Sequence, residues 1–579
     1  MERAPGLSAE ILQRMIEYFN EIRPEIPTFL TLILVAITPI YTGTHASLSR
    51  PSTAAKPKKK SRSKRHAPQA DNRMEGLTPI DALLYPLLTG TMLTGLYYLI
   101  KWLQDPALLN KILNYYLTAF GMASIWQFVR DLLLVGTSFI FPTRYSYKSK
   151  IWTMDQARMK FVSIAHSEAT NDDIHSSPLP GRLSRSPLPS KLSRLIWKFR
   201  KTQTQPHALI EAFAKGFGTT TVAINQSSVL AAIVAISAVL YYNLVDRPWW
   251  LTNLFGFSFC YSALQLLSPT TFWTGTLILT SLFFYDIYFV FYTPMMIEVA
   301  TKLDIPVKLL IPKSPDSRQS DDKRALTLLG LGDIVLPGIM LGLALRFDLY
   351  MYYLRKQKHS KSNTGNGQDN VLNQSKKTSI VTKADYVIAT GNWGERFWLD
   401  SEALKHEGGY FPKPYFTAGM IGYVFGMLVT ETVMFVTKHG QPALLYLVPS
   451  VLGSLWTTAV ARGELAHMWA YTEAEGTKAE EKGKPPNDDD RSADPSDTLL
   501  SKGENHSSTS NQPGGLDSNK PKDEILVKEK KPSISHTSRE ERELDEDNVN
   551  DRRLFYVSIS LPEEPKTAAK SSDDNDKKD

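Results

Sequence analysis

The chain has 579 residues, of which 42% are hydrophobic, and its formal net charge is +7. Its apolar residues form long runs separated by Lys- and Arg-rich stretches, a pattern that excludes an ordinary soluble protein. The basic residues flank the apolar runs, so we expect them to orient the chain in a lipid bilayer, and we expect no nucleic acid as a partner. The single cysteine, Cys260, excludes an intrachain disulfide and a cysteine-based zinc site.

Nine apolar runs are long enough for a transmembrane helix, which needs about 20 mainly apolar residues. In chain order they span residues 26–45, 80–103, 112–141, 222–244, 248–267, 271–296, 325–345, 415–437 and 442–462. They predict an all-α polytopic membrane protein with nine transmembrane helices. The fifth and sixth runs are so close that they indicate either a tight hairpin or a displaced boundary.

The basic loops predict the orientation of these spans. Lys and Arg are concentrated after the first, third and seventh runs, and cytosolic loops carry such an excess. The N-terminus is then lumenal and the C-terminus cytosolic, which requires an odd number of spans. The chain accordingly divides into a lumenal tail (1–25), an N-terminal membrane region with basic loops (26–220), a membrane core (221–465) and a charged cytosolic tail (466–579).

Two polar segments, residues 356–382 and 472–579, contain few aromatic residues and are expected to be disordered. Within the second, residues 554–561 alternate in hydrophobicity like a β-strand. We interpret this stretch as either a short docking motif or a stray apolar patch.

Two acidic residues lie where a bilayer makes them costly. Asp286 is in the middle of the sixth run and Asp333 is in the seventh, and neither run contains Lys, Arg or His. An ionisable side chain at the centre of a span costs about 2.5–3.5 kcal/mol, which makes it a candidate functional residue. At about 1.5 Å per helical residue, both carboxyls are expected about 12 Å from the lumenal ends of their spans, and so at a similar depth.

Paired carboxyls of this kind predict aspartyl protease chemistry. Two facing carboxyls in a low-dielectric site cannot both ionise, so they share one proton. The ionised carboxyl takes a proton from water, and the water oxygen attacks a peptide carbonyl that the protonated carboxyl polarises. This reaction is expected to need no metal, cofactor or covalent intermediate. The alternative is that the two acids only hydrogen-bond to helix carbonyls.

The residues beside the acids favour the catalytic interpretation. Gly330 and Gly332 flank Leu331 directly before Asp333. Each glycine weakens a helix by about 1 kcal/mol relative to alanine, but it lets another backbone approach closely. The hydroxyl of Tyr285 is a candidate donor to a carboxylate or to the substrate backbone. We therefore predict that Tyr285 and residues 330–332 contact substrate.

A third acid and an irregular helix start lie further along the chain. Glu431, in the eighth run, has no local cation and is a rival candidate for a direct role. The ninth run begins with Gln441, Pro442, Ala443 and Leu444, where proline removes a backbone donor and makes the helix start irregular. A cleavable peptide must be extended, and an irregular segment of this kind can pair with it. We expect these four residues to bind substrate.

Together, these segments resemble the signal peptide peptidase family of intramembrane aspartyl proteases. Residues 285–286 within YDIYFVF resemble its YD motif, residues 330–333 followed by IVLPG resemble its GxGD motif, and residues 441–444 followed by LYLVP resemble its PAL motif. The sequence PVKLLIP, between the two acids, is also similar to a family feature. The resemblance covers roughly residues 245–465 and implies a bundle like that of the presenilins and signal peptide peptidases.

The resemblance implies that Asp286 and Asp333 are the catalytic pair and that the PAL segment shapes the active site. It also implies substrates that span the bilayer once with a lumenal C-terminus, such as remnant signal peptides and type II or tail-anchored proteins. The expected location is the endoplasmic reticulum membrane, although the terminal DNDKKD departs from the family's usual dilysine signal. Presenilins share two of the motifs but have the opposite orientation, and a vacuolar or endosomal member of the family is a further alternative.

Two hypotheses from other classes stay open at this point. In a transporter, the two acids would form a cation or proton site between broken helices, although the sequence contains no evident internal repeat. In a noncatalytic scaffold, the chain would recognise membrane spans during quality control. A homo-oligomer and quality-control proteins are therefore the protein partners under consideration, besides the substrates and the lipid bilayer.

Overall fold

The structure, a computed structural model, describes most of the chain in separate stretches. These are residues 23–55, 74–103, 107–148, 150–155, 158–163, 174–185, 189–204, 208–214, 218–303, 306–312, 326–360, 380–390, 393–400, 410–437, 440–473 and 555–560. Most of the two segments expected to be disordered lies outside them. The chain divides into two compact units, of which the first comprises residues 1–211, 220–478 and 558–579, and the second comprises residues 212–219 and 479–557. The helices and the site described below belong to the first unit.

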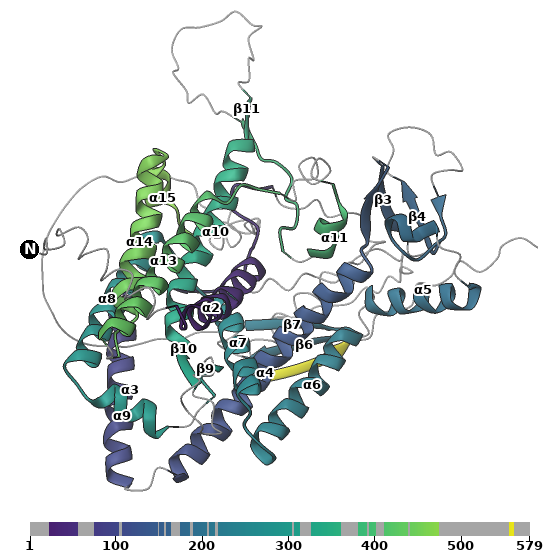
Figure 1. Cartoon of the computed structure of the whole chain (residues 1–579). Coiled ribbons are helices and arrows are strands. Elements are labelled where there is room, and N and C mark those ends of the chain that lie inside the picture. Colours follow the sequence, from purple (N-terminus) through teal and green to yellow (C-terminus); the bar gives the residue numbers. More distant parts are fainter. Residues whose placement is uncertain are drawn as a thin grey trace, which may run out of the picture. The chain divides into compact units, whose positions relative to one another are not determined.

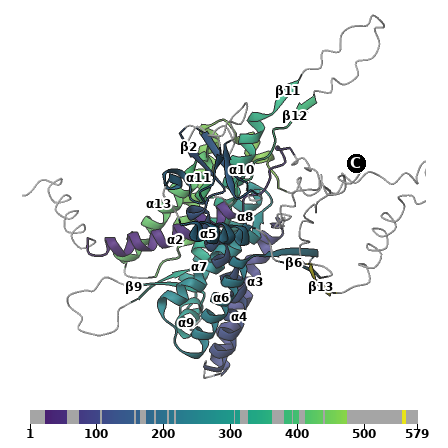
Figure 2. The same ribbon diagram turned by 90° about the vertical axis from the view of Figure 1, so that its right-hand side faces the viewer.

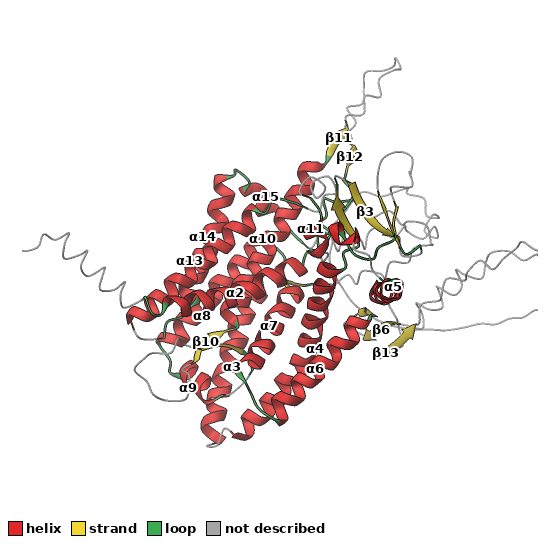
Figure 3. Cartoon of the chain, turned by 45° about the vertical axis from the view of Figure 1, so that its right-hand side comes forward, coloured by secondary structure: helices red, strands yellow, loops and turns green. Residues whose placement is uncertain are grey.

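Among the described residues, seven helices are long and apolar enough to cross a membrane. They are α2 (Ile26–Ala46), α3 (Asp81–Leu103), α6 (Gln226–Leu244), α8 (Phe272–Phe291), α10 (Gly332–Lys356), α13 (Pro414–Thr437) and α14 (Leu444–Ala461). Figures 1 and 3 show them as a bundle of long helices. The chain is therefore a multi-pass membrane protein that is mostly helical.

The two other predicted spans are also helical, as α4 (Ala107–Ile140) and α7 (Trp249–Leu266). Neither is among the seven helices above, and the count of nine spans stays a prediction. The connection between the fifth and sixth predicted spans is tight, since only strand β8 (Leu267–Pro269) and two further residues separate α7 from α8. The side chain of Thr271 caps α8 by accepting a hydrogen bond from the Thr274 N–H at 3.1 Å.

Shorter helices accompany the bundle. They are α5 (Ser190–Thr204), α9 (Met295–Lys302), α11 (Trp393–Trp398), α15 (Leu465–Ala470) and the 3₁₀ helix η2 (Gly181–Arg185). Helix α9 begins after Pro294, which ends the sixth predicted span earlier than expected.

The expectation of an all-α chain is wrong outside the long helices, because several small sheets accompany them (Figure 2). Strands β1 (Glu75–Leu77) and β8 are parallel. One antiparallel sheet consists of β2 (Arg144–Tyr147), β3 (Lys150–Asp155), β4 (Lys160–Ser163) and β5 (Ile174–His175). Two antiparallel pairs are formed by β9 (Lys308–Pro312) with β10 (Leu326–Gly330) and by β11 (Lys358–Ser360) with β12 (Ile380–Thr382). Strands β6 (Ala208–Ala214), β7 (Gly218–Ile224) and β13 (Phe555–Ser560) complete the set. Hence both ends of the segment 356–382 are ordered strands, and residues 554–561 contain the strand that their alternation indicates.

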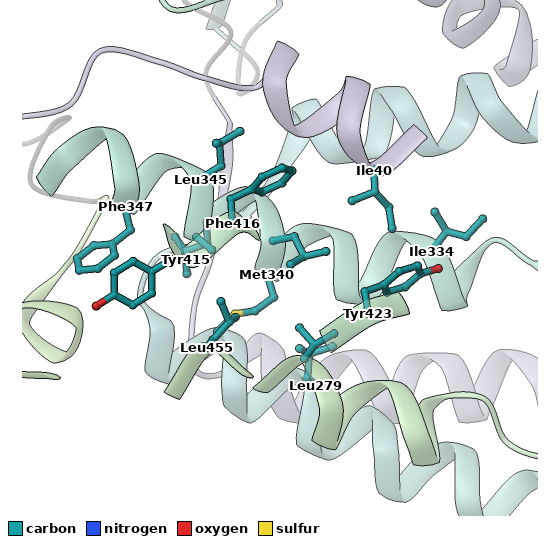
Figure 4. Close-up of a cluster of buried hydrophobic side chains, with 14 of the residues drawn as sticks. Ile40, Leu279, Ile334, Met340, Leu345, Phe347, Tyr415, Phe416, Tyr423 and Leu455 are labelled. Carbon is teal, nitrogen blue, oxygen red and sulfur yellow. The ribbon is translucent and has the colours of Figure 1, made fainter. Parts of the chain in front are cut away.

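Helix α10 is the centre of the bundle. Of its most apolar 18 residues, 83% are buried, compared with at most 39% in the six other helices of that group. Its side chains Met340 and Phe347 pack with residues of α2, α8, α13 and α14 in one apolar core (Figure 4). Asp348, near the other end of α10, accepts hydrogen bonds from the N–H groups of Tyr415 and Phe416 at 3.2 and 2.9 Å. These are unpaired donors of the first turn of α13, so a buried acid of α10 caps that helix.

Helices α13 and α14 pack closely against each other. A Cβ atom at Gly422 would lie only 2.6 Å from the backbone oxygen of Ser450 and 2.5 Å from the hydroxyl of Ser454. Small residues at this position let two helices approach within a membrane, where burial from lipid contributes little to their association. The pairing matters for the site because it holds the first residues of α14 beside α8 and α10.

Candidate active site

Asp286 is on the inward face of α8 and is 7% exposed. Its Oδ2 atom accepts a hydrogen bond of 3.2 Å from the backbone N–H of Leu444. Leu444 is the first residue of α14, where backbone N–H groups have no partner within the helix and the helix dipole favours a negative charge. The structure thus joins the YD and PAL segments, 158 residues apart, through a contact to one carboxyl.

Asp333 is the second residue of α10 and directly follows strand β10 and Leu331. Its carboxyl is close enough to interact electrostatically with the carboxyls of Asp286 and Glu431. The residue as a whole is partly exposed. The hydroxyl of Tyr423, a fully buried residue of α13, donates to the backbone oxygen of Asp333 at 3.3 Å and holds the start of α10.

The helix expected before Asp333 is absent from the described residues, and the depth of the carboxyl in the bilayer stays a prediction. The run that begins at residue 325 does not start as a helix, because residues 326–330 pair with β9 as strand β10. The helix begins only at Gly332, so Asp333 is in its first turn and not two turns inside. Glycines at 330 and 332 disfavour helix, and the strand pairing replaces its hydrogen bonds.

The two glycines before Asp333 have different surroundings. A Cβ atom at Gly330 would lie 3.3 Å from Oδ2 of Asp333, whereas a Cβ atom at Gly332 would meet no described atom within 4 Å. Leu331, between them, is 7% exposed and packs against Gly256 of α7. Gly330 therefore gives the carboxyl its space, Gly332 borders open space, and the Leu331 side chain belongs to the core.

The ring of Tyr285 lies against α3. Its ring packs on that of Phe289, with centroids 4.5 Å apart, and lies next to Gly90 of α3. No hydrogen bond from its hydroxyl to another described residue is present, so its expected role as a donor to a carboxylate or to substrate stays a prediction.

The PAL segment turns into α14 beside Asp286. Pro442 is buried, Ala443 is the residue before the first helical turn, and the Leu444 side chain is 5% exposed. The Gln441 side chain donates to the hydroxyl of Thr437 at the end of α13, at 3.2 Å. The contact seen here is therefore between Leu444 and the catalytic candidate, and substrate binding by these four residues stays a prediction.

Glu431 is closer to the pair than its sequence context indicates. It is 4% exposed on α13, two helical turns beyond Tyr423, and its carboxyl interacts with that of Asp333. The signal available in the sequence was a lone acid in an apolar run with no local cation. The site therefore contains three acidic side chains.

The strand pair β9–β10 is the part of the site that the sequence did not reveal. Asn253 of α7 accepts a hydrogen bond from the Leu310 N–H at 2.7 Å and donates one to the Leu310 carbonyl at 2.8 Å. The side-chain amide thus occupies the outer edge of β9 as a neighbouring strand would. A polar residue in an apolar run was the signal that could have identified Asn253.

The register of the β9–β10 pair shows in which direction the backbone groups of β10 point. Leu310 is opposite Leu328, and opposite residues in an antiparallel pair direct their backbone groups either both inward or both outward. The N–H and carbonyl of Leu310 point away from β10 and bond the Asn253 side chain. The N–H and carbonyl of Leu328 therefore point away from β9. Gly330, two residues on, has the same direction. The outer edge of β10 therefore leads directly to Asp333.

Comparison with known proteins identifies relatives of the chain. A model of the family described as signal peptide peptidase matches residues 69–475. The chain is 31% identical over 240 residues to mouse signal peptide peptidase and 30% identical over 238 residues to the human protein of that name, in each case covering 41% of this chain. It is 32% identical over 252 residues, or 44% of this chain, to intramembrane protease 2 of Caenorhabditis elegans.

The matched stretches span about half of these relatives, namely 48% of the mouse and human proteins and 44% of the worm protein. The family match, by contrast, covers well over half of this chain and includes all three motif segments. The chain belongs to the signal peptide peptidase family.

Proposed function

We propose that the chain is an intramembrane aspartyl endopeptidase that cleaves single-span helical substrates with water activated by Asp286 and Asp333. The observation that carries the proposal is that Asp286 on α8, held by the Leu444 N–H, is close enough to Asp333 on α10 for their charges to interact. Membership in the signal peptide peptidase family supports it, as do the printed names of the mouse and worm relatives.

The contact from Leu444 favours Asp286 as the ionised member of the pair. A hydrogen bond to a carboxylate stabilises the charged form, and a helix N-terminus adds to that effect. Asp333, which also faces Glu431, then carries the shared proton. In this assignment Asp286 is the general base and Asp333 is the general acid.

The reaction follows from these roles. As the water oxygen bonds to the scissile carbonyl carbon, Asp286 takes one water proton and Asp333 gives its proton to the carbonyl oxygen. This produces a tetrahedral diol. Asp286 then passes its proton to the amide nitrogen as the C–N bond breaks, and Asp333 recovers a proton from one diol hydroxyl. The two carboxyls end in their starting state.

The outer edge of β10 supplies a place for the substrate backbone. A helix shields its carbonyls, so a transmembrane substrate must unwind before cleavage, and pairing with a strand edge stabilises an extended segment. The groups of Leu328 and Gly330 point outward along β10 toward Asp333. With Asn253 on the other edge of the sheet, β10 is the edge at which an added strand reaches the carboxyls.

The substrate class and location follow from the family and the basic loops. Substrates with one span and a lumenal C-terminus, including remnant signal peptides and type II or tail-anchored proteins, would enter from the bilayer. The proposed location is the endoplasmic reticulum membrane, with a lumenal N-terminus and a cytosolic C-terminus.

Purified chain in detergent micelles, incubated with a labelled signal peptide, tests the proposal. We expect cleavage that a transition-state mimic of aspartyl proteases blocks and that Asp286→Asn and Asp333→Asn each abolish. Asp131→Asn is a matched control, because Asp131 is a membrane acid of α4 that bonds Arg130 and Tyr261 away from the site. Cleavage that persists in either site variant would overturn the mechanism.

A further inference from the structure

Helix α5 (Ser190–Thr204) has three distinct faces, and one of them is buried against the protein. On that face, Trp197 joins Tyr145, Trp152 and Phe161 in a small apolar cluster over the sheet β2–β5. These contacts fix the rotation of the helix about its own axis.

Arg200, on the same face, locks the helix further. Its guanidinium donates to the carbonyls of Pro142 and Pro178 at 2.6 and 2.7 Å and lies over the rings of Phe141 and Phe161. Burial lowers the pKa of Arg200 to about 10, so the side chain stays charged at neutral pH. Because Trp197 and Arg200 are held, the other two faces of α5 must point away from the sheet.

The second face is an exposed apolar stripe. Leu192, Leu195 and Phe199 follow the helical spacing of three and four residues and are 44%, 65% and 37% exposed. The third face, next to it, is an exposed basic stripe with the same spacing, formed by Lys191, Arg194, Lys198 and Lys201. Helix α5 contains no acidic residue.

The apolar stripe continues from the end of a predicted span. The ring of Phe199 packs on that of Phe141, with centroids 5.7 Å apart, and Phe141 directly follows Ile140, the last residue of α4. Ile140 is itself 61% exposed. Helix α5 also contacts α6, a membrane-crossing helix, and Figure 3 shows it end-on beside the end of α6, so it lies across that helix.

We propose that α5 lies in the plane of the bilayer surface, with its apolar stripe among the headgroups and its basic stripe bound to anionic lipids. A helix with an apolar stripe of Leu and Phe beside a Lys/Arg stripe, and with low overall hydrophobicity, has the composition of interfacial helices. The loop that carries α5 is on the predicted cytosolic side, where the leaflet contains anionic lipids that attract such basic clusters.

Charge and continuity with α4 identify a bilayer surface as the occupant. A bilayer surface presents both an apolar layer and negative charge along the whole length of a helix, which matches two parallel stripes. The bilayer surface is also expected at the end of α4, where the apolar stripe of α5 begins. The proposal does not depend on the peptidase activity.

A single environment-sensitive fluorophore tests it in the full chain. Cys260 is fully buried and is exchanged by Cys260→Ser, so Leu195→Cys can carry the only label. The chain is reconstituted into bilayers of phosphatidylcholine, with or without phosphatidylserine, that contain a nitroxide-labelled lipid as quencher. We expect loss of most of the emission with phosphatidylserine and little loss without it. The matched control is a label at Met159→Cys, 52% exposed in the turn just before strand β4, which should stay unquenched in both bilayers.

Neutralising the basic stripe separates charge from apolar contact. Exchange of its four residues for glutamine should weaken docking about fivefold for each residue, and high salt should act in the same direction. A label at residue 195 that is unquenched in both bilayers would overturn the proposal. Equal quenching in both would show apolar insertion without lipid charge recognition, and equal quenching at residue 159 would place the membrane contact elsewhere than on α5. Each of these results contradicts the proposal as stated.

Discussion

The backbone N–H of Leu444 points at the carboxyl of Asp286, with 3.2 Å between the nitrogen and Oδ2. This contact gives the PAL segment a physical role that its side chains do not reveal. Prolines at helix starts are common because the first N–H groups have no helical partner. Here one of those donors is used on a buried acid, and it favours the charge that a general base needs.

Removing that single donor should slow catalysis without changing any side chain. Replacement of the Leu444 amide by an ester deletes the N–H group. A hydrogen bond to a charged group contributes about 1.5–3 kcal/mol, so we expect kcat to fall about tenfold to a hundredfold with little change in KM. The same exchange at Leu447, whose N–H bonds only the helix carbonyl of Ala443, is the matched control. Equal losses from both esters would show that the Leu444 contact is only structural.

The two glycines of the GxGD segment should respond differently to one methyl group. In Gly330→Ala the new Cβ atom would be 3.3 Å from Oδ2 of Asp333 and would displace the carboxyl, whereas in Gly332→Ala it meets open space. We expect Gly330→Ala to lower cleavage of a signal peptide at least about tenfold more than Gly332→Ala, because small misplacements of reacting groups are costly. Rates measured at saturating substrate would decide, and the reverse order would contradict this assignment of the two positions.

Asn253 should control where a substrate is cut. Asn253→Ala removes both hydrogen bonds to Leu310 and frees the second edge of the sheet, at a cost of about 1–3 kcal/mol in stability. We expect slower cleavage and a spread of cleavage positions, measured by mass spectrometry of the products. Asn243→Ala is the matched control, since Asn243 bonds Asn114 and Thr118 between α4 and α6. A single unchanged cleavage position in Asn253→Ala would argue against edge selection.

A buried arginine should matter more for stability than an exposed one on the same helix. Arg346 is 4% exposed and bonds Glu473, Ser47 and Ser268, which ties the segment after α15 to the bundle. Arg346→Met leaves the Glu473 carboxylate without its cation, and we expect a loss of about 3–5 kcal/mol in the free energy of unfolding. Arg355→Met, which breaks the more exposed pair with Glu464, should cost about 1 kcal/mol or less. Thermal unfolding of the purified variants measures both, and equal shifts would show that the buried network contributes little.

Local sequence predicted most of the long helices. An apolar run of about 20 residues must be helical in lipid, because no water is there to bond its backbone. For this reason each predicted span overlaps a helix, and the isolated acids at 286 and 333 were recognisable as candidates. The same reasoning was wrong at residues 326–330, where an equally apolar stretch pairs with β9 instead.

The amphipathic pattern of α5 was also present in the sequence, but the sequence did not show which face of the helix packs against the protein. Only the packing of Trp197 and Arg200 on the sheet β2–β5 shows which two faces of the helix are left exposed. The sheet itself depends on pairing between strands that single-strand alternation does not specify.

What the amino-acid sequence indicated alone is therefore the positions of the long helices and the two isolated acids, while the number and orientation of the spans stay predictions. Each of these follows from the free energy of placing one segment or one charge in lipid. Tertiary structure decided the short start of α10, the use of Leu444 and Asn253 as backbone partners, and the proximity of Glu431 to Asp333. These depend on contacts between segments far apart in the chain, and no local preference encodes which donor meets which acceptor.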